Sequence, residues 1–307
     1  MYSLFSPVIR PIPIISASAG GLFVASVLFP PARMNSTSSH SWNVRAYEPR
    51  HKSWPYNPSD FTRQDSSVDT SFYSSPRFVT HIDDAAIASL REYYETALPR
   101  KGRILDFCSS WVSHYPRSLE DAVSLGELKV TGMGMNKAEL DANQVLNNGR
   151  MLVDLNVNPD VNSALLGANA IGQAEAEKLD ASTNVVSIDY LTKPVEVLKS
   201  LLAATKCGGS VHLAISNRCF PTKAISRWLR VREDERLMMV GDFLHFAGWE
   251  QIEIVELSDG TVNDDLQHDS SSQGTLQSLM GLIGMNRRDP IWVVRAKKGN
   301  HLDSEGV

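Results

Sequence analysis

The stretch RILDFCSSWVSHYP, residues 103–116, begins as a short apolar run and continues into a polar loop. Its first five residues have the composition of a β-strand, with the acid Asp106 close to the strand end. Loop N–H groups that follow such a strand can face a bound anion or nucleotide-type cofactor. The stretch therefore predicts a strand that leads into a ligand-binding loop.

Six further strand-like runs follow, and helical patterns separate most of them. We expect these strands at 128–131, 151–155, 185–189, 210–216, 252–257 and 290–295, and helices from 82 to Pro99, from Pro194 to Gly208-Gly209, and around 222–230 and 234–246. Alternating strands and helices favour a mainly parallel sheet covered on both faces. The sequence thus predicts a Rossmann-like α/β fold with a seven-stranded sheet flanked by helices.

Charge and cysteine content indicate which ligands are unsuitable and whether the cysteines form disulfides. The formal net charge is −5 and the sequence pI is about 5.9, which argues against non-specific nucleic-acid binding because that needs a basic surface. The three cysteines, Cys108, Cys207 and Cys219, have no zinc-type spacing. We expect free thiols and no metal site.

The N-terminus differs in composition from the rest of the chain. Residues 1–47 contain arginine but no Asp or Glu, and the apolar stretch 14–29 lies between prolines. For residues 1–34, a cleaved mitochondrial presequence, a membrane anchor or signal segment, and a tail preceding a true start at Met34 all remain open. Localisation to mitochondria or an organelle membrane is expected, with the cytoplasm as the alternative. Residues 35–76 are expected to form an irregular linker, residues 77–300 the folded domain, and 259–289 a loop insertion.

Polar residues at the first three strand ends are the candidate cofactor ligands, since the carboxyl ends of parallel strands meet at one edge of a sheet. Asp106 can order the first loop, and the hydroxyls of Ser109 and Ser110 can bind a ligand or merely cap a helix. At the second strand end, Gly134 stands where an acid commonly binds ribose, and Asn136 with Glu139 has capping-box spacing. Asp154, beside Leu155, can read an adenine amino group or cap a turn.

The fourth and fifth strand ends supply candidates for a second substrate. Asp189 suits a general base and Tyr190 can stack against a substrate, with helix-start capping and core packing as the alternative for both. Arg218 and Lys223 suit an anionic acceptor or a cofactor carboxylate, unless Arg218 pairs with a structural carboxylate, and Asn217 is expected near the acceptor. His245 is a further candidate, or a hydrogen-bonded histidine at a helix end. Neither a GxSxG elbow nor a P-loop is present, which argues against acyl-transfer enzymes and P-loop NTPases.

In this order, the motifs resemble class I S-adenosylmethionine (SAM) methyltransferases. They are most similar to a group of methyltransferase-like proteins that carry SSWVSH (109–114), DYLTKP (189–194) and SNRCFPTKAI (216–225). The resemblance spans residues 80–296 and implies SAM as cofactor and methyl transfer to a small molecule. The chain departs from such enzymes in lacking the glycine-rich turn and the ribose-binding acid. A non-catalytic binding or regulatory protein on a degenerate methyltransferase fold is therefore the alternative.

Overall fold

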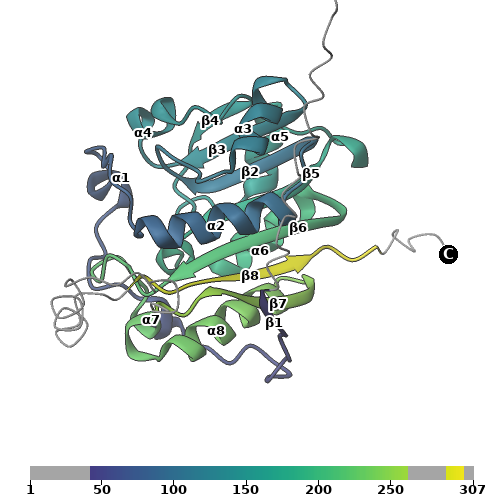
Figure 1. The fold of residues 1–307 in the computed structure, drawn as a ribbon. Coiled ribbons are helices and arrows are strands. Elements are labelled where there is room, and N and C mark those ends of the chain that lie inside the picture. Colours follow the sequence, from purple (N-terminus) through teal and green to yellow (C-terminus); the bar gives the residue numbers. More distant parts are fainter. Residues whose placement is uncertain (1–41, 262–287, 301–307) are drawn as a thin grey trace, which may run out of the picture. The chain divides into compact units, whose positions relative to one another are not determined.

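A mixed eight-stranded sheet forms the centre of the computed structural model, which describes residues 42–261 and 288–300. The strand order is β1-β7-β8-β6-β5-β2-β3-β4 (Figure 1). Strands β2 to β6 run parallel, whereas β8 runs antiparallel to both β6 and β7. The strands are β1 (Asn43–Ala46), β2 (Gly102–Ser109), β3 (Leu128–Gly134), β4 (Gly149–Leu152), β5 (Leu179–Val185), β6 (Thr205–Ser216), β7 (Glu250–Ser258) and β8 (Ile291–Lys297).

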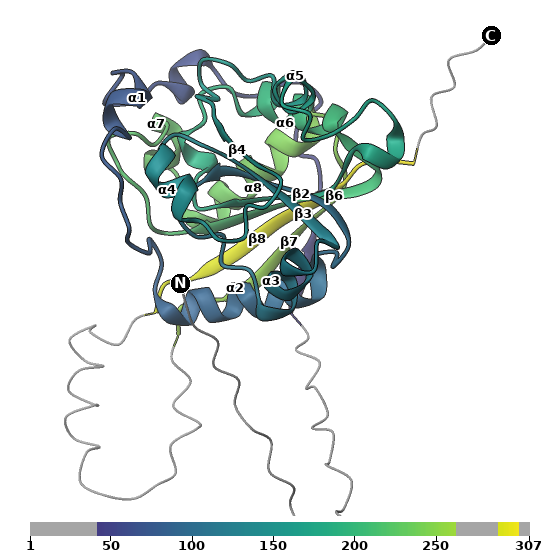
Figure 2. The ribbon, with the colours of Figure 1, turned by 90° about the horizontal axis from the view of Figure 1, so that it is seen from above.

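Helices cover both faces of this sheet. One face carries α2 (Asp84–Ala97) and α3 (Arg117–Ser124), and the other carries α5 (Val161–Gly167), α6 (Pro194–Ala204) and α8 (Glu233–Phe246), as Figure 2 shows for α2 and α3 against α5 and α6. The shorter elements are α1 (Asp69–Phe72), α4 (Lys137–Ala142), α7 (Ser226–Arg230) and the 3-10 turns η1 (Pro58–Phe61), η2 (Glu175–Glu177) and η3 (Ile188–Tyr190).

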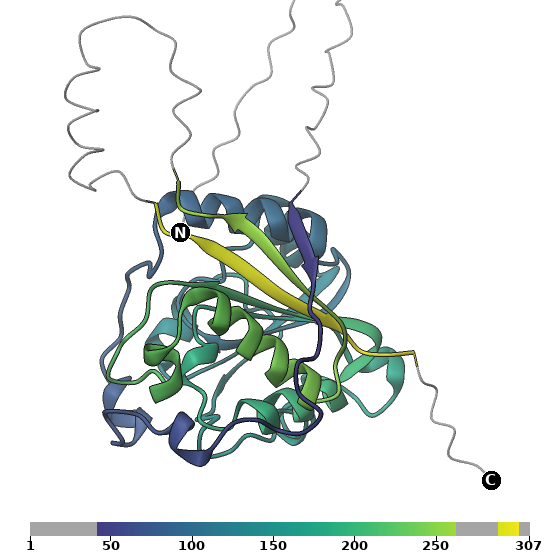
Figure 3. The same ribbon diagram turned by 90° about the horizontal axis from the view of Figure 1, so that it is seen from below.

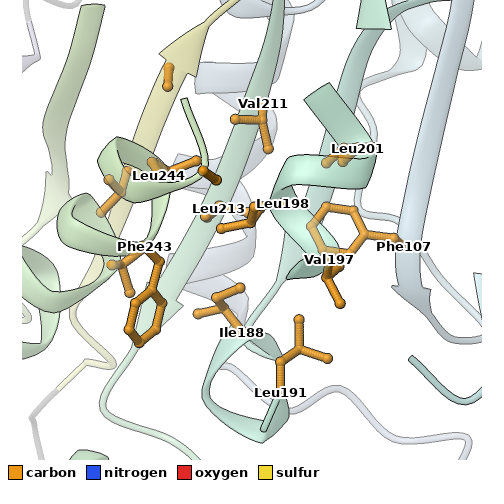
Figure 4. Packing of buried hydrophobic residues seen from close by; sticks show 14 of the residues in the cluster. Phe107, Ile188, Leu191, Val197, Leu198, Leu201, Val211, Leu213, Phe243 and Leu244 are labelled. Atoms are coloured by element: carbon orange, nitrogen blue, oxygen red, sulfur yellow. The ribbon is translucent and has the colours of Figure 1, made fainter. Parts of the chain in front are cut away.

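Alternation along the strands explains the two cores. In β2, Ile104 faces the α2 side, whereas Leu105 and Phe107 face α6, because successive strand side chains point to opposite faces. In Figure 4, Phe107 of β2 lies beside Val197 of α6, while Val211 and Leu213 of β6 lie between α6 and the Phe243-Leu244 pair of α8. Each buried side chain of this size contributes about 1.5–3 kcal/mol to folding.

The predicted fold class is confirmed, and the strand count differs by one. The seven expected strands form the core of the sheet, and β1 is added at its edge by antiparallel pairing with β7. All four side chains of β1 are exposed, so no hydrophobic alternation marks it in the sequence. Backbone pairing with β7 is what makes this segment a strand.

Several element boundaries move from their expected positions. The fourth expected strand, 185–189, lies earlier as β5, and residues 188–190 form η3. Helix α6 ends at Ala204, so Gly208 and Gly209 lie within β6 rather than capping the helix. At Gly208, φ is +74° beside a register shift between β5 and β6, a conformation that suits glycine.

Residues 47–69, which we call the strap, pack across α8 and α7 (Figure 3). The hydroxyls of Tyr47 and Tyr56 donate to the fully buried carboxylate of Asp242 on α8. Asp60 forms an ion pair of 2.6 Å with Arg230 of α7. These contacts make the strap part of the folded domain, where composition alone suggests a linker over 35–76.

The N-terminal segment and most of the loop insertion lie outside the described residues. The targeting or anchoring role of residues 1–34 therefore stays a prediction. Among the helices that the structure describes, none has both the length and the apolar character needed to cross a membrane.

Candidate functional site

A cavity of about 280 Å³ lies at the carboxyl ends of β2, β3, β4 and β5. Its volume is close to the lower end of the range for small-molecule pockets, roughly 300–1,000 Å³. The chain leaves β2 toward β3 on one side and continues from β5 to β6 on the other, so the cavity lies at the topological switch point where open α/β sheets bind ligands.

The loop after β2 is held by hydrogen bonds to Asp106. Its Oδ2 accepts from the hydroxyls of Ser109 at 2.6 Å and Ser113 at 2.7 Å, and its Oδ1 accepts from Thr183 at 3.1 Å. Burial raises the pKa of Asp106, and the three hydroxyl donors partly offset this rise. Side-chain hydrogen bonds thus shape a turn that glycines would otherwise make. The loop-ordering role expected for Asp106 agrees with this geometry.

Gly134 lines the cavity, and its lack of a side chain is a packing requirement. A Cβ at this position would lie 2.2 Å from the carbonyl oxygen of Ser109, the residue opposite it in the β2–β3 pairing. An acid therefore cannot occupy the end of β3 without moving the backbone of the neighbouring strand.

A carboxylate nevertheless reaches the same part of the cavity from Glu139 on α4. Its Oε2 accepts from the hydroxyl of Ser110 at 2.8 Å, and its Oε1 accepts from the amide of Arg77 at 2.7 Å. The predicted capping box is only half formed, because Asn136 caps the amide of Glu139 at 3.1 Å while the glutamate side chain turns to the cavity. Asn136 itself does not line the cavity; its Nδ2 donates to the carbonyl of Tyr73 at 2.8 Å.

The segment after β4 places Asp154 and Leu155 in the cavity wall as expected. The Oδ1 of Asp154 accepts from the amide of Asn156 at 2.9 Å. Asn156 then donates to Asp69 at 2.8 Å and to the carbonyl of Tyr190 at 3.0 Å. Asp154 thus belongs to a network that joins the third strand end to the strap.

Of the two predicted catalytic residues, the structure brings only Tyr190 to the cavity. Its hydroxyl accepts from the amide of Phe220 at 2.8 Å, and the two ring centroids are 6.0 Å apart. Asp189 is 2% exposed, does not line the cavity, and has an Oδ2 with no hydrogen-bond partner among the described residues. Burial raises the pKa of Asp189 to about 8. A general-base role for Asp189 is therefore wrong in this structure, because its carboxyl is buried behind the wall.

Of the residues predicted to bind the acceptor, likewise, only some line the cavity. Arg218 lines the cavity while its Nε donates to Asp289 at 2.7 Å, so the expected pairing with a structural carboxylate is present and a ligand-binding role stays a prediction. Asn217 is exposed outside the lining, and His245 lies in the last turn of α8 beside Tyr47. Lys223 is fully buried in ion pairs of the strap and does not reach the cavity.

Several lining residues lie outside the set predicted from sequence. Tyr73, Arg77 and His81 reach the cavity from the segment that follows the strap, and His114 reaches it from the loop after β2. Burial lowers the pKa of His114 to about 4, so its imidazole is neutral near pH 7. One feature of the sequence could have indicated this segment: the aromatic residues Phe72 and Tyr73 interrupt an otherwise Ser- and Pro-rich stretch.

Backbone strain is concentrated at this cavity. Cys108, His114 and Val186 have φ of 53°, 55° and 43° and all line it. Such conformations cost about 1–3 kcal/mol for a non-glycine residue, and the cost is highest for a β-branched one such as Val186. Burial raises the pKa of the Cys108 thiol to about 12, which leaves it protonated. The strained positions therefore shape the wall rather than supply a thiolate.

Comparisons with known proteins give fold-level likenesses only. No model of a known protein family matches the chain, and no curated protein matches it in sequence. The Haemonchus contortus phosphoethanolamine N-methyltransferase 2 in complex with SAM is 12% identical, with 69% of this chain and 52% of that one covered and a TM-score of 0.41. The chain thus spans about half the length of that methyltransferase.

Two other solved structures are similar at the same level. The geranyl diphosphate C-methyltransferase of Streptomyces coelicolor A3(2) is 12% identical over 75% of this chain and 96% of that one, with a TM-score of 0.43. The [4+2]-cyclase SpnF is 14% identical over 75% and 91%, with a TM-score of 0.44. The strand order β4-β3-β2-β5-β6-β8-β7, with β8 antiparallel, is that of a Rossmann-like α/β sheet.

Proposed function

We propose that this protein is a SAM-dependent methyltransferase that acts on a small-molecule acceptor. The observation that carries the proposal is the cavity at the switch point, where Asp106, Ser110, Asp154 and Tyr190 converge from separate strand ends. The strained residues that line it support a functional role, since such conformations cluster at active and ligand sites.

The residues on the cofactor side suit the parts of SAM. Asp154 offers a carboxylate for the adenine amino group, beside the apolar side chain of Leu155. Glu139 offers the carboxylate for ribose hydroxyls that Gly134 cannot carry. Bound SAM would supply a methyl group on a sulfonium, which is electrophilic without any metal.

The protein's own contribution would be positioning and water exclusion. Tyr73, Tyr190 and Phe220 wall the acceptor side with rings, which can hold an acceptor in line with the methyl donor. His114 is a weak proton acceptor because burial holds its pKa at about 4. We therefore expect an acceptor that is nucleophilic near pH 7 without strong general-base assistance.

One observation favours a non-catalytic binding protein as the second candidate. The hydroxyls of Ser109 and Ser110 already donate to Asp106 and Glu139, so the turn offers few free donors to a cofactor. A degenerate pocket of this kind could bind a nucleoside without transferring a group.

Calorimetry of the full-length chain with SAM and with S-adenosylhomocysteine tests the proposal. We expect a dissociation constant on the order of tens of micromolar, or about −6 kcal/mol. Asp154→Ala should weaken binding at least about tenfold by removing a charge-assisted hydrogen bond. Asp121→Ala is the matched control, because Asp121 is an exposed carboxylate on α3 that pairs with Arg117.

Absence of heat with millimolar SAM, on protein shown to be folded, would overturn the methyltransferase proposal in favour of the non-catalytic candidate. Equal weakening in both Asp→Ala variants would instead remove Asp154 from the cofactor site.

A further inference from the structure

The positively charged side chain of Arg77 lines the cavity and packs against three aromatic rings. Its guanidinium carbon lies 4.5 Å from the ring centroid of Phe72, 5.4 Å from that of Phe220 and 5.8 Å from that of Tyr73. Its Nη2 donates to the carbonyl of Phe72 at 3.1 Å. Stacking on rings and one backbone bond fix the orientation of the guanidinium while most of its N–H groups remain uncommitted.

The charge of Arg77 has no carboxylate within salt-bridge distance in residues 42–261 and 288–300. The carboxylates of the cavity contact other groups: Asp69 pairs with Arg63 and Lys223, Asp106 accepts three hydroxyls, and Asp154 accepts from the amide of Asn156. Glu139 contacts Arg77 through the backbone amide rather than the guanidinium. Within the described residues, the guanidinium of Arg77 thus lines the cavity without forming an ion pair.

A second guanidinium lies on the same side of the cavity. Arg218 is bonded through Nε to Asp289, and its side chain is 62% exposed. Phe220, two residues later, packs against Arg77 and against Tyr190. The guanidinium of Arg77 therefore lies beside Phe220 and Tyr190, which we assign to the acceptor, although its backbone amide donates to Glu139.

We propose that the acceptor carries an oxyanion, a carboxylate or a phosphate, which binds the guanidinium of Arg77. Calling the bound molecule the methyl acceptor rests on the proposed function, whereas the binding of an oxyanion to Arg77 does not. A planar guanidinium presents paired donors that match both kinds of oxyanion. The surrounding rings hold the half-buried guanidinium in place before an anion binds.

Ligand-observed NMR on the full-length protein tests the site with two probes, inorganic phosphate by ³¹P line broadening and ¹³C-labelled acetate in parallel. Broadening of at least one probe by the wild type is expected, and the probe that responds distinguishes a phosphate from a carboxylate site. Arg77→Gln should weaken that binding about tenfold. Arg77→Lys should retain part of it, because the charge remains while the paired donors and ring stacking are reduced. Arg232→Gln is the matched control, since Arg232 is 92% exposed and should leave binding unchanged.

Calorimetry with S-adenosylhomocysteine and with 5′-methylthioadenosine, which lacks the amino-acid end, separates the acceptor from the cofactor. Unchanged affinity of Arg77→Gln for both nucleosides, with loss of anion binding, supports the acceptor assignment. Loss of S-adenosylhomocysteine binding alone would overturn it, because Arg77 would then hold the cofactor carboxylate. Equal anion binding by wild type and Arg77→Gln, or no anion binding by folded wild type, would also overturn it. Failure of the wild type to bind either nucleoside would count against the proposed function, while the NMR result would still decide the anion site.

Discussion

At residue scale, Gly134 offers a sharp test of how closely β2 and β3 approach. We predict that Gly134→Ala destabilises the protein by about 2 kcal/mol or more, because its Cβ would lie 2.2 Å from a backbone oxygen and 3.1 Å from Leu140. Gly134→Asp would carry the same cost, so adding an acid there should not improve SAM binding. Urea unfolding measures the effect, with Gly167→Ala as control because nothing lies within 4 Å of that Cβ. A Gly134→Ala protein as stable as wild type would contradict the strand geometry.

At the scale of elements, Lys223 fastens the strap to the domain. Its Nζ lies 3.2 Å from Asp65, 3.1 Å from Asp69 and 2.8 Å from the carbonyl of Ser67, with the side chain fully buried. Burial alone would raise the pKa of Asp69, but hydrogen bonds from Arg63, Asn156 and Lys223 hold it below its ordinary value. These contacts therefore stabilise the ionised form of Asp69, whose side chain lines the cavity.

We predict that Lys223→Met costs about 3 kcal/mol, the usual effect of removing one partner of a buried ion pair. In Lys223→Met, amide hydrogen exchange measured by mass spectrometry should become faster over residues 63–82, because this segment loses its ion pairs to Lys223. Lys137→Met is the control: Lys137 pairs with Asp141 on the surface of α4 with its side chain 73% exposed, and such pairs contribute about 0–1 kcal/mol. Unchanged exchange over 63–82 in Lys223→Met would show that other contacts hold the segment.

At the scale of the whole molecule, buried titratable groups shape the dependence of stability on pH. Burial lowers the pKa of His114 to about 4 and that of His212 to about 3. The unfolded chain binds these protons near pH 6.5, so their contribution to stability is lost as pH falls below that value. Asp189 acts in the opposite sense. Its folded pKa of about 8 lies above the unfolded value, so its contribution is lost as pH rises toward 8.

Asp189→Asn isolates that last effect. We predict that the free energy of unfolding of this variant, relative to wild type, is higher near pH 8 than near pH 5 by roughly 3–4 kcal/mol. The neutral amide mimics the protonated acid and removes the cost of ionising a buried group. Urea unfolding at both pH values, with the exposed Asp121→Asn as control, measures the difference. A difference that does not change with pH would mean that Asp189 is ionised in the folded protein.

The sequence by itself determined the fold class and the edge of the sheet that carries the site. Alternating apolar residues fix which face of a strand is buried, and parallel strands bring their carboxyl ends together. Asp106, Ser109, Asp154 and Tyr190 were therefore placed at one cavity from chain order alone, and all four line it.

Only the tertiary structure decided which strand-end side chains face that cavity. Asn136 and Asp189 both lie at strand ends, yet each turns into the protein, because the rotation of a side chain beyond the last paired residue depends on its neighbours rather than on spacing. Tyr73 and Arg77 could not be found at all from periodicity. Their segment has no repeating apolar pattern, and it is held at the cavity by contacts such as Lys223–Asp69, which join residues more than a hundred positions apart.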